Sequence, residues 1–353
     1  MPDASPQRVT LMDVAKRAGV SRTTASFVTT GRTDMRISAD AQERVLRAAR
    51  ELDYRPSLLA RSLRTNRSQT IGLLSDGVAA DAFAGDMIRG ALAAALLHEH
   101  LLFIAETGGD VALEKRLIQN MVDRGVGGFV YASMYTRRIR VSAGMRSQPM
   151  VLVNCTTRSK IFPSVIPDEH EAGRSAARVL LQHGHSDRIV LVGKTPPYVM
   201  AAVERLAGIS AVLGESGLEP AGSVDTRWWP NPAFKAVGDY LAQGHRPSAF
   251  ICLNDRVALG AYQACQAAGL AVPQDISIVS FDDSDLAGWL QPQLTSVAIP
   301  HFEMGRRAAE ILLSEDLVPK THLVPMTLHE RESVGPPSVR RRRRRAGSVP
   351  PEG

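Results

Sequence analysis

The most constraining feature of this sequence is a change of hydrophobic pattern at Thr70. From Ile71 to Phe281, short apolar runs of strand length alternate with longer segments of helical periodicity. Such alternation predicts parallel sheets with helices on both faces. The residues before Thr70 indicate short helices instead. The chain is therefore expected to contain a small helical part followed by a larger α/β body.

The body is expected to have two similar halves, each of which alternates strands and helices. The expected strands span residues 71–75, 101–106, 128–132, 150–154, 188–192, 249–253 and 276–281, and the expected helices span 86–97, 112–123, 171–182, 200–215, 232–243 and 258–268. Two such sheets side by side create a cleft at the carboxyl ends of their strands. Polar residues that end these strands are therefore candidates for binding a ligand.

Three short helices are predicted in the first 52 residues. The first ends at Gly19, and the second, Arg22–Val28, begins after the cap residue Ser21. Thr10 and Ser38 stand where their hydroxyls can cap the first and third helices. A tight glycine-containing turn between two short helices is typical of the helix-turn-helix motif.

Charge is distributed unevenly along the chain. Residues 1–68 contain 13 Lys and Arg against 7 Asp and Glu, whereas residues 69–339 contain 23 against 28. A basic module on a mildly acidic body indicates a polyanion partner for the module, although uneven scatter by chance gives the same pattern. Six consecutive arginines, Arg340–Arg345, lie among Pro, Gly and Ser. We expect a disordered tail there that adds salt-sensitive, sequence-independent affinity for DNA.

The second predicted helix is a candidate for reading DNA. In a helix-turn-helix this helix enters the major groove, and its first residues face the base edges. Those residues here are Arg22 and Thr23, with Phe27 one turn later. Arg22 can make a bidentate contact to guanine, and Phe27 can contact a thymine methyl group. The alternative is that Arg22 and Thr23 are solvated surface and that Phe27 belongs to the core.

A short helix is predicted after the third one. Pro56 ends the preceding helical pattern, and Ser57 can cap a segment of two turns that ends at Arg64. An isolated helix of this length is unstable in water. It therefore needs a partner, which a symmetry mate together with DNA can supply.

Three stretches of this sequence resemble the lactose/galactose-repressor (LacI/GalR) family of bacterial transcription regulators. The stretches are VTLMDVAKRAGVSRTTASFV, ERVLRAARELDYRPSLLARSLRTNRSQTIGLL and, in the body, PQLTSV with HERES. The resemblance implies an all-α helix-turn-helix headpiece with a hinge helix, followed by an α/β periplasmic-binding-protein-like body of two parallel-sheet lobes. The implied segments are the headpiece (1–56), the hinge helix and linker (57–69), the two-lobed effector-binding and dimerisation domain (70–334) and the Arg-rich tail (335–353). It also implies crossovers between the lobes near residues 154–167 and 283–300.

The resemblance implies that a homodimer binds a near-palindromic double-stranded DNA operator, and it favours a repressor. Leu63 of the hinge helix is then a wedge in the minor groove at the centre of the operator. Phe27 stands where many members carry a base-reading Arg, so the operator sequence is not carried over. The implied DNA-binding residues are Thr10, Ser21, Arg22, Thr23, Thr24, Ser26, Phe27, Tyr54, Ser57, Leu58, Ala60, Arg61 and Leu63.

The resemblance further implies that a small-molecule effector, a sugar or related metabolite, binds in the interlobe cleft. Carboxylate, amide and guanidinium groups there bind vicinal hydroxyls, and an aromatic face covers apolar C–H groups. The alternative is that Asn254 and Asp255 cap the next helix and that Asp282 stabilises a crossover. The implied effector-binding residues are Phe83, Asn154, Arg205, Trp228, Trp229, Asn254, Asp255 and Asp282, with Asp168 as a further cleft position.

An alternative function is a solute-binding or sugar-modifying protein built on the same α/β body. A solute-binding protein would need an export signal, and an enzyme would need a catalytic pair. The sequence shows no apolar secretory segment, no complete P-loop, no GxSxG motif and no CxxC pair among its three cysteines. We therefore expect no catalysis, no metal and no cofactor. No run of about 18 apolar residues occurs, so we expect no membrane contact and a cytoplasmic, nucleoid-associated protein.

Overall fold

The computed structural model describes residues 9–30, 36–54, 69–79, 85–194, 196–314 and 317–338. The chain divides into two compact units, Met1–Gln69 and Thr70–Gly353. The predicted hinge residues Ser57, Leu58, Ala60, Arg61 and Leu63 lie outside the described residues, as do Phe83 and the arginine tail.

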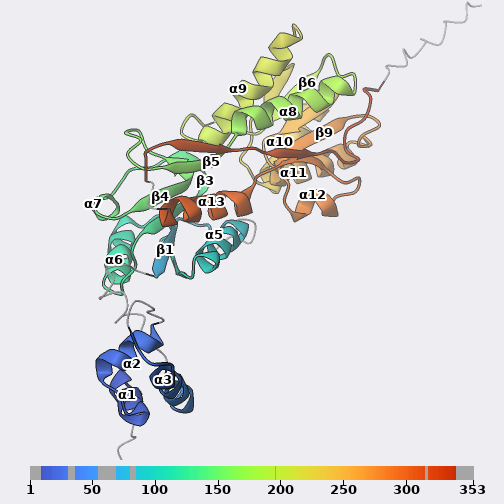
Figure 1. Cartoon of the computed structure of the whole chain (residues 1–353). Coiled ribbons are helices and arrows are strands. Elements are labelled where there is room, and N and C mark those ends of the chain that lie inside the picture. Colours follow the sequence, from blue (N-terminus) through green and yellow to red (C-terminus); the bar gives the residue numbers. More distant parts are fainter. Residues whose placement is uncertain are drawn as a thin grey trace, which may run out of the picture. The chain divides into compact units, whose positions relative to one another are not determined.

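The described residues of the N-terminal unit form three helices, α1 (Leu11–Ala18), α2 (Arg22–Thr29) and α3 (Ala39–Glu51) (Figure 1). Small side chains let these helices approach one another closely. The core of the unit consists of Val14, Ala15, Ala18, Ala25, Val45 and Ala48. The three helices predicted from the sequence are confirmed, and their bounds differ from the prediction by no more than a residue or two.

Local hydrogen bonds fix the ends of these helices. Thr10 and Asp13 form a capping box at the start of α1, and Gly19 ends the helix in the left-handed conformation that glycine adopts without strain. The Arg44 Nε donates to the Ala18 carbonyl at 3.1 Å, which ties α3 to the end of α1. The tight turn between α1 and α2 is therefore fixed by the left-handed Gly19 and by the hydrogen bond from α3.

The body is built on two six-stranded sheets, each in its own lobe. We call the lobe with the first sheet the N-lobe, and its strands have the order β11-β5-β4-β3-β1-β2. All of its neighbouring strands are parallel. The strands are β1 (Thr70–Ser75), β2 (Leu101–Glu106), β3 (Phe129–Arg138), β4 (Met150–Thr156), β5 (Ser164–Pro167) and β11 (Thr321–Val324).

The second sheet defines the C-lobe and has the order β12-β10-β9-β8-β6-β7. Its strands are parallel except for the antiparallel pair of β10 and β12. The strands are β6 (Ile189–Val192), β7 (Gly222–Val224), β8 (Ala249–Cys252), β9 (Ser277–Asp282), β10 (Thr295–Ala298) and β12 (Thr327–His329).

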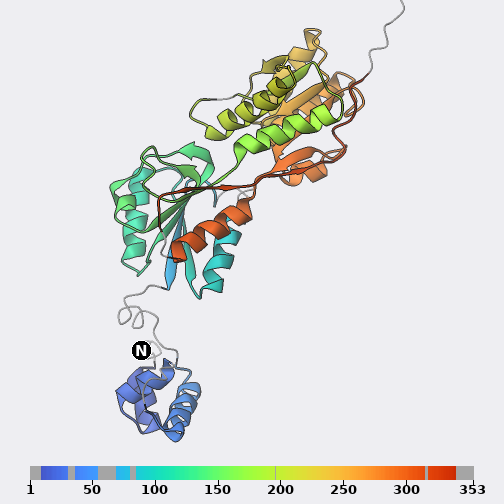
Figure 2. The same ribbon diagram turned by 45° about the horizontal axis from the view of Figure 1, so that its top comes forward.

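Helices cover both sheets, as the alternation of the sequence predicts (Figures 1 and 2). In the N-lobe, α5 packs against α13, and in the C-lobe α8 packs against α9 and α10 against α11. The helices of the body are α5 (Gly85–Leu97), α6 (Val111–Val122), α7 (Ala143–Arg146), α8 (Glu169–Gln182), α9 (Met200–Glu215), α10 (Pro230–Ala242), α11 (Asp255–Ala267), α12 (Asp285–Trp289) and α13 (His301–Leu313).

Among its described residues, the body has three crossovers between the lobes. The chain passes from β5 to α8 at residues 167–169, from β10 to α13 at 298–301 and from β11 to β12 at 324–327. The two crossovers that we expected therefore lie at the C-terminal ends of the predicted ranges. The third was not predicted, because β11 and β12 are strands of four and three residues whose pairing is decided by distant partners.

Candidate nucleic-acid and effector sites

The N-terminal turn of α2 faces solvent. Ser21 caps this helix by accepting a hydrogen bond from the Thr24 amide at 3.0 Å. Arg22 and Thr23 are exposed, whereas Ala25 is buried in the core of the unit. The fold therefore leaves the two predicted base-reading residues accessible on a helix that the core holds in place.

The other described DNA-binding candidates have structural roles as well. The Thr10 hydroxyl donates to Asp13 Oδ2 at 2.7 Å, and the Ser21 and Thr24 hydroxyls lie 2.8 Å apart. Tyr54 is half-buried and packs against the core. Ser26 and Phe27 are also half-buried on α2. These positions remain predictions as DNA contacts.

Arg205 is the centre of a buried polar cluster in the body. It lies on α9 and is only 1% exposed. Its Nε donates to Glu169 Oε2 at 2.6 Å, its Nη2 to Glu169 Oε1 at 3.2 Å and its Nη1 to the Leu253 carbonyl at 2.6 Å. The Phe281 ring lies under the guanidinium, 4.6 Å from its centroid to Cζ. The cluster therefore joins the start of α8, the end of β8 and the end of β9.

The electrostatics of this cluster follow from burial of three carboxyl groups near one guanidinium. Burial by itself lowers the pKa of Arg205, but the charge of Glu169 and then that of Asp282 outweigh it, so the pKa is raised. Burial also raises the pKa of Asp282 well above its ordinary value, although Arg205 acts in the opposite direction. Arg205 thus remains charged, and the site resists further negative charge.

Glu169 is a site residue that our sequence reasoning missed. It is the first residue of α8 and is 4% exposed. Asp168, the neighbouring residue that we did name, caps α8 by accepting a hydrogen bond from the Glu171 amide at 3.1 Å. In the sequence, Glu169 is recognisable only as an acid next to a helix cap at a predicted interlobe crossover. Its role becomes clear only from its contact with Arg205 in the structure.

Asn154 lies in β4 two residues before its end, because the strand continues past the predicted end to Thr156. Its side chain forms hydrogen bonds within the N-lobe. Its Nδ2 donates to the Ser133 carbonyl at 3.1 Å, and its Oδ1 accepts from the Thr136 hydroxyl at 2.6 Å. The same hydroxyl lies 3.4 Å from Glu169 Oε1. Thr136 therefore connects the predicted N-lobe residue to the C-lobe cluster.

Asn254 has the helix-capping role that is the alternative for it, whereas Asp255 has different partners. Asn254 caps α11 by accepting from the Val257 amide at 2.8 Å. Asp255 is completely buried, and its Oδ2 accepts from the Ser284 amide at 2.7 Å, while its Oδ1 accepts from the Ser296 hydroxyl at 2.8 Å. Both oxygens therefore have internal partners that anchor the segment after β9, and the effector contact of Asp255 remains a prediction.

Asp282 ends β9 beside Arg205, with 3.7 Å between its Oδ1 and Arg205 Nη1. Its side chain keeps 18% of its surface exposed, and its backbone is left-handed at φ 106°. The next residue, Asp283, forms an ion pair with Arg331 at 2.6 Å, and its Oδ2 lies 2.7 Å from His329 Nδ1. The Asp282 carbonyl accepts from the Ile299 amide at 3.3 Å, at the crossover from β10 to α13, so the backbone of Asp282 contacts the crossover as the alternative predicts.

The two predicted aromatic residues differ in their surroundings. Trp228 is half-buried, donates from Nε1 to the Lys194 carbonyl at 2.8 Å and has its ring 5.9 Å from Arg205 Cζ. Trp229 is 57% exposed and has its ring 4.8 Å from Arg256 Cζ. The structure thus brings Trp228 to the cluster around Arg205 and gives Trp229 a different, exposed cation–π partner.

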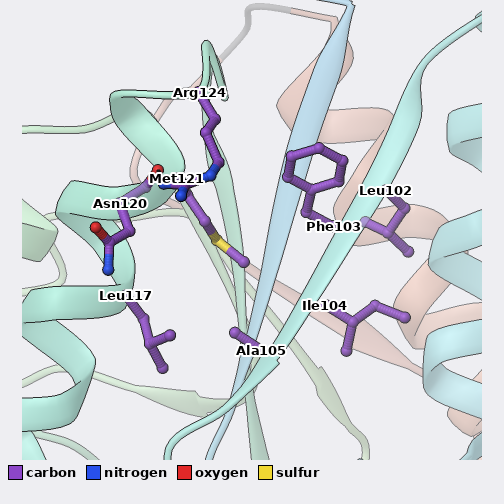
Figure 3. Close-up of a pocket in the computed structure, with 8 residues that line it drawn as sticks. All are labelled: Leu102, Phe103, Ile104, Ala105, Leu117, Asn120, Met121 and Arg124. Carbon is purple, nitrogen blue, oxygen red and sulfur yellow. Dashed lines mark hydrogen bonds between the residues drawn. The ribbon is translucent and has the colours of Figure 1, made fainter. Parts of the chain in front are cut away.

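Two hollows on the body lie away from this cluster. One, of about 390 Å³, lies between β2 and α6 of the N-lobe, and the other, of about 460 Å³, lies between α10 and α11 of the C-lobe. Figure 3 shows the first, in which Phe103 and Ala105 point toward α6 while Leu102 and Ile104 point away. Neither hollow includes a predicted effector residue.

Other chemistry finds no support in the part of the chain that the structure describes. Within it, no group of three or more His, Cys, Asp or Glu side chains is arranged to hold a metal ion. Within the same residues no helix is long and apolar enough to cross a membrane. The three cysteines are buried, and burial raises the pKa of each thiol, which makes them poor nucleophiles.

Comparison with known proteins identifies the family. Residues 10–57 match the model described as bacterial regulatory proteins, lacI family, and residues 170–334 match the periplasmic binding protein-like domain. The ribose operon repressor of Haemophilus influenzae is 31% identical over 309 residues, which cover 86% of this chain and 91% of that protein. The HTH-type transcriptional repressor PurR of Vibrio campbellii is 32% identical over 321 residues, which cover 89% and 93%. The chain belongs to the lacI family of bacterial regulatory proteins.

Solved structures of lacI-family regulators have the same fold as this family member. The Lac repressor dimer bound to operator and the anti-inducer ONPF is 26% identical with a TM-score of 0.78, and the match covers 93% of this chain and 100% of that one. The complex of the transcriptional regulator CelR with cellobiose is 27% identical with a TM-score of 0.64, and it covers 92% and 100%. The fold class predicted from the sequence is confirmed.

Proposed function

We propose that this lacI-family protein is a transcriptional repressor that binds a near-palindromic operator as a dimer and responds to a small-molecule effector in its body. The observation that carries the proposal is the helix-turn-helix of the N-terminal unit, in which Arg22 and Thr23 remain exposed on a helix fixed by the core. A solute-binding or sugar-modifying protein would have no use for this unit. Regulation without catalysis and a cytoplasmic, nucleoid-associated location follow from the proposal.

Effector binding is proposed for the cluster around Arg205. Asp282 has a partly exposed carboxyl group beside Arg205, and Trp228 supplies an aromatic ring nearby. These are the groups that bind hydroxyls and cover apolar C–H groups of a sugar. The relatives support this assignment, because one is a ribose operon repressor and another was solved with cellobiose.

Dimerisation is proposed for an apolar face of the N-lobe. β2 is the edge strand of its sheet and exposes Leu101, Phe103 and Ile104, while α5 exposes Leu96 and Leu97. An exposed apolar edge strand favours association with a second surface, and the Lac repressor neighbour was solved as a dimer. Leu97→Glu with Phe103→Glu should shift the protein to monomers in sedimentation, whereas Val318→Glu at another exposed apolar position should not.

The function is tested first by selecting sequences from a random duplex library with the full chain. Enrichment of a near-palindromic site is expected, and recovery of random sequence alone would contradict a sequence-specific regulator. A panel of neutral sugars is then screened by thermal shift, because a ligand that binds the native state raises its stability. A hit must change the affinity for the selected operator.

Two variants separate ligand contact from structural support in the body. Asp282→Asn should keep the fold and reduce the operator response to the sugar found in the screen. Asp255→Asn should lower the melting temperature, because it disturbs the hydrogen bonds from Ser284 and Ser296. An Asp282→Asn protein that responds fully at the same sugar concentration would remove Asp282 from the proposed site.

A further inference from the structure

Glu169 is bound to the guanidinium group of Arg205. Without Glu169, this group would be available to a ligand in the proposed effector site. It engages Arg205 through both carboxyl oxygens, at 2.6 and 3.2 Å, and the Leu253 carbonyl takes a third donor at 2.6 Å. A bidentate contact of this kind is the geometry by which arginine recognises a carboxylate or a phosphate. The anion-binding edge of Arg205 is therefore already filled by a side chain of the protein.

Carboxyl groups outnumber guanidinium groups around Arg205. Asp282 lies 3.7 Å from its Nη1, and Asp255 is close enough to act on it electrostatically. One guanidinium is thus surrounded by three carboxyl groups. Burial raises the pKa of Asp255 and of Asp282, and for Asp282 the charges of Asp255 and Glu169 add to this effect, because negative charge is poorly stabilised at buried positions.

We infer that Glu169 determines the class of effector: a polyhydroxyl compound that carries no phosphate or carboxylate group. This inference rests on the proposed function of the cluster as the effector site. A hydroxyl group can donate to the partly exposed carboxyl of Asp282 and accept from a remaining N–H of Arg205. An anionic group would have to displace Glu169 from Arg205 and would then lie against further carboxyl groups.

Glu169 is held in this position from both lobes. Its Oε1 lies 3.4 Å from the Thr136 hydroxyl of β3, and that hydroxyl donates to Asn154. The backbone of α9 also approaches α8 closely, because a Cβ at Gly173 would overlap the Arg205 carbonyl. The pairing of Glu169 with Arg205 is therefore built into the packing of the two helices.

The test uses inorganic phosphate as a probe, so the effector itself need not be identified first. Wild type, Glu169→Gln and Glu171→Gln are melted as full chains in phosphate and in chloride of equal ionic strength. Glu171 is two residues away and exposed, so it serves as the matched control. We expect a rise in melting temperature in phosphate only for Glu169→Gln, and we expect this rise to disappear in Glu169→Gln/Arg205→Gln.

Either of two results would overturn the inference. The first is that phosphate raises the melting temperature of Glu169→Gln no more than that of the wild type. The second is that phosphate raises the melting temperature of the wild type but not that of the double variant. If Glu169→Gln does not fold, the wild type and the double variant decide the question, since an equal response of these two upholds the inference. Removing both partners of a buried ion pair is tolerated better than removing one.

A second measurement compares ligands that differ only by an anionic group. Galactose and galacturonate, and ribose and ribose 5-phosphate, are titrated against the wild type. An anionic member that binds more tightly than its neutral counterpart contradicts the inference, whereas at least tenfold weaker binding supports it. Operator selection is measured separately, so a failure of the regulator function is distinguishable from a failure of the effector class.

Discussion

Two arginines of this protein, one exposed and one buried, have different roles. Arg22 is exposed at the start of α2, where its guanidinium is accessible to a partner. Arg205 is buried and donates three hydrogen bonds to Glu169 and Leu253. Breaking such a buried pair by removing one partner typically costs about 3–5 kcal/mol, whereas an exposed charge has little effect on stability. Mutations at the two arginines should therefore separate binding from folding.

The first prediction concerns base reading by Arg22. Arg22→Ala should weaken specific operator binding by about 1–3 kcal/mol and relax the preference at one base pair in each half-site. The melting temperature should not change, because the side chain is exposed. Binding is measured by fluorescence anisotropy on the selected operator and on single-base variants. Equal weakening on all sequences would make Arg22 a phosphate contact instead.

The second prediction concerns His185, which is buried in the C-lobe. Its ring nitrogens lie 3.1 Å from the Ser248 hydroxyl, 3.0 Å from the Ser277 hydroxyl and 3.0 Å from the Gly335 carbonyl. Burial lowers its pKa below the ordinary value of 6.5. The unfolded chain therefore takes up a proton at a higher pH than the folded body does. The stability from neutral His185 is complete above about pH 6.5 and is lost as the pH falls toward the lowered pKa.

Urea unfolding between pH 7 and pH 5 measures this loss, which for one group is at most about 1.4 kcal/mol per pH unit. His185→Gln should show a smaller decline over this range than the wild type. His98→Gln removes an exposed histidine and is the control, for which the wild-type decline is expected. Identical pH profiles of the wild type and His185→Gln would disprove the assignment.

At the scale of elements, glycines decide how closely the paired helices of each lobe approach. In the C-lobe, a Cβ at Gly173 of α8 would overlap the carbonyl of Arg205, and a Cβ at Gly208 of α9 would overlap that of His170. In the N-lobe, a Cβ at Gly90 of α5 would overlap the carbonyl of Phe302, and a Cβ at Gly305 of α13 would overlap that of Met87. Each pair therefore places two helix backbones in direct contact, which in the C-lobe brings Glu169 to Arg205.

The third prediction follows from this packing. Gly173→Ala and Gly208→Ala should each destabilise the body by about 1–3 kcal/mol, because the helices must separate to accommodate the methyl group. Gly214→Ala on the same helix α9 meets nothing within 4 Å, so stability should be unchanged or raised by up to about 1 kcal/mol. Thermal unfolding of the three variants checks this. A Gly173→Ala protein as stable as Gly214→Ala would show that the close contact is not required.

On the scale of the whole molecule, positive charge is concentrated at the two ends of the chain. The basic residues of the N-terminal unit and the six arginines at 340–345 flank a mildly acidic body. The arginines lie outside the described residues, so their role is proposed from charge alone. Contacts to phosphates release counterions and make DNA affinity depend on salt.

The fourth prediction is that deletion of residues 340–353 lowers non-specific DNA affinity and its dependence on salt. The slope of log affinity against log salt should decrease in magnitude by about 0.9 for each arginine that contacts a phosphate. The choice of operator and the binding of the effector should not change. Affinities for random and selected duplexes at several salt concentrations give the slopes. A slope identical to that of the full chain would show that the tail does not contact DNA.

Features that depend on neighbouring residues were determined by the sequence alone. The caps at Thr10, Ser21 and Ser38 and the turn at Gly19 are local, so the three helices of the N-terminal unit could be predicted from residue types and spacing. The alternation of strands and helices likewise predicted the α/β body. Asn154, Asn254 and Asp282 were expected at strand ends, and the structure places them at or within two residues of the ends of β4, β8 and β9.

Only the tertiary structure decided which of these side chains remain available. Glu169 and Arg205 are 36 residues apart, and Asp255 is 29 and 41 residues from Ser284 and Ser296. Such partners meet because α8, α9 and the strands of the C-lobe pack together, and no local pattern specifies that packing. The helix α13 is a similar case, since it follows a C-lobe strand but covers the N-lobe beside α5. Burial and long-range hydrogen bonding are properties of the packed molecule, and they determine which polar residues support the fold and which can bind a ligand.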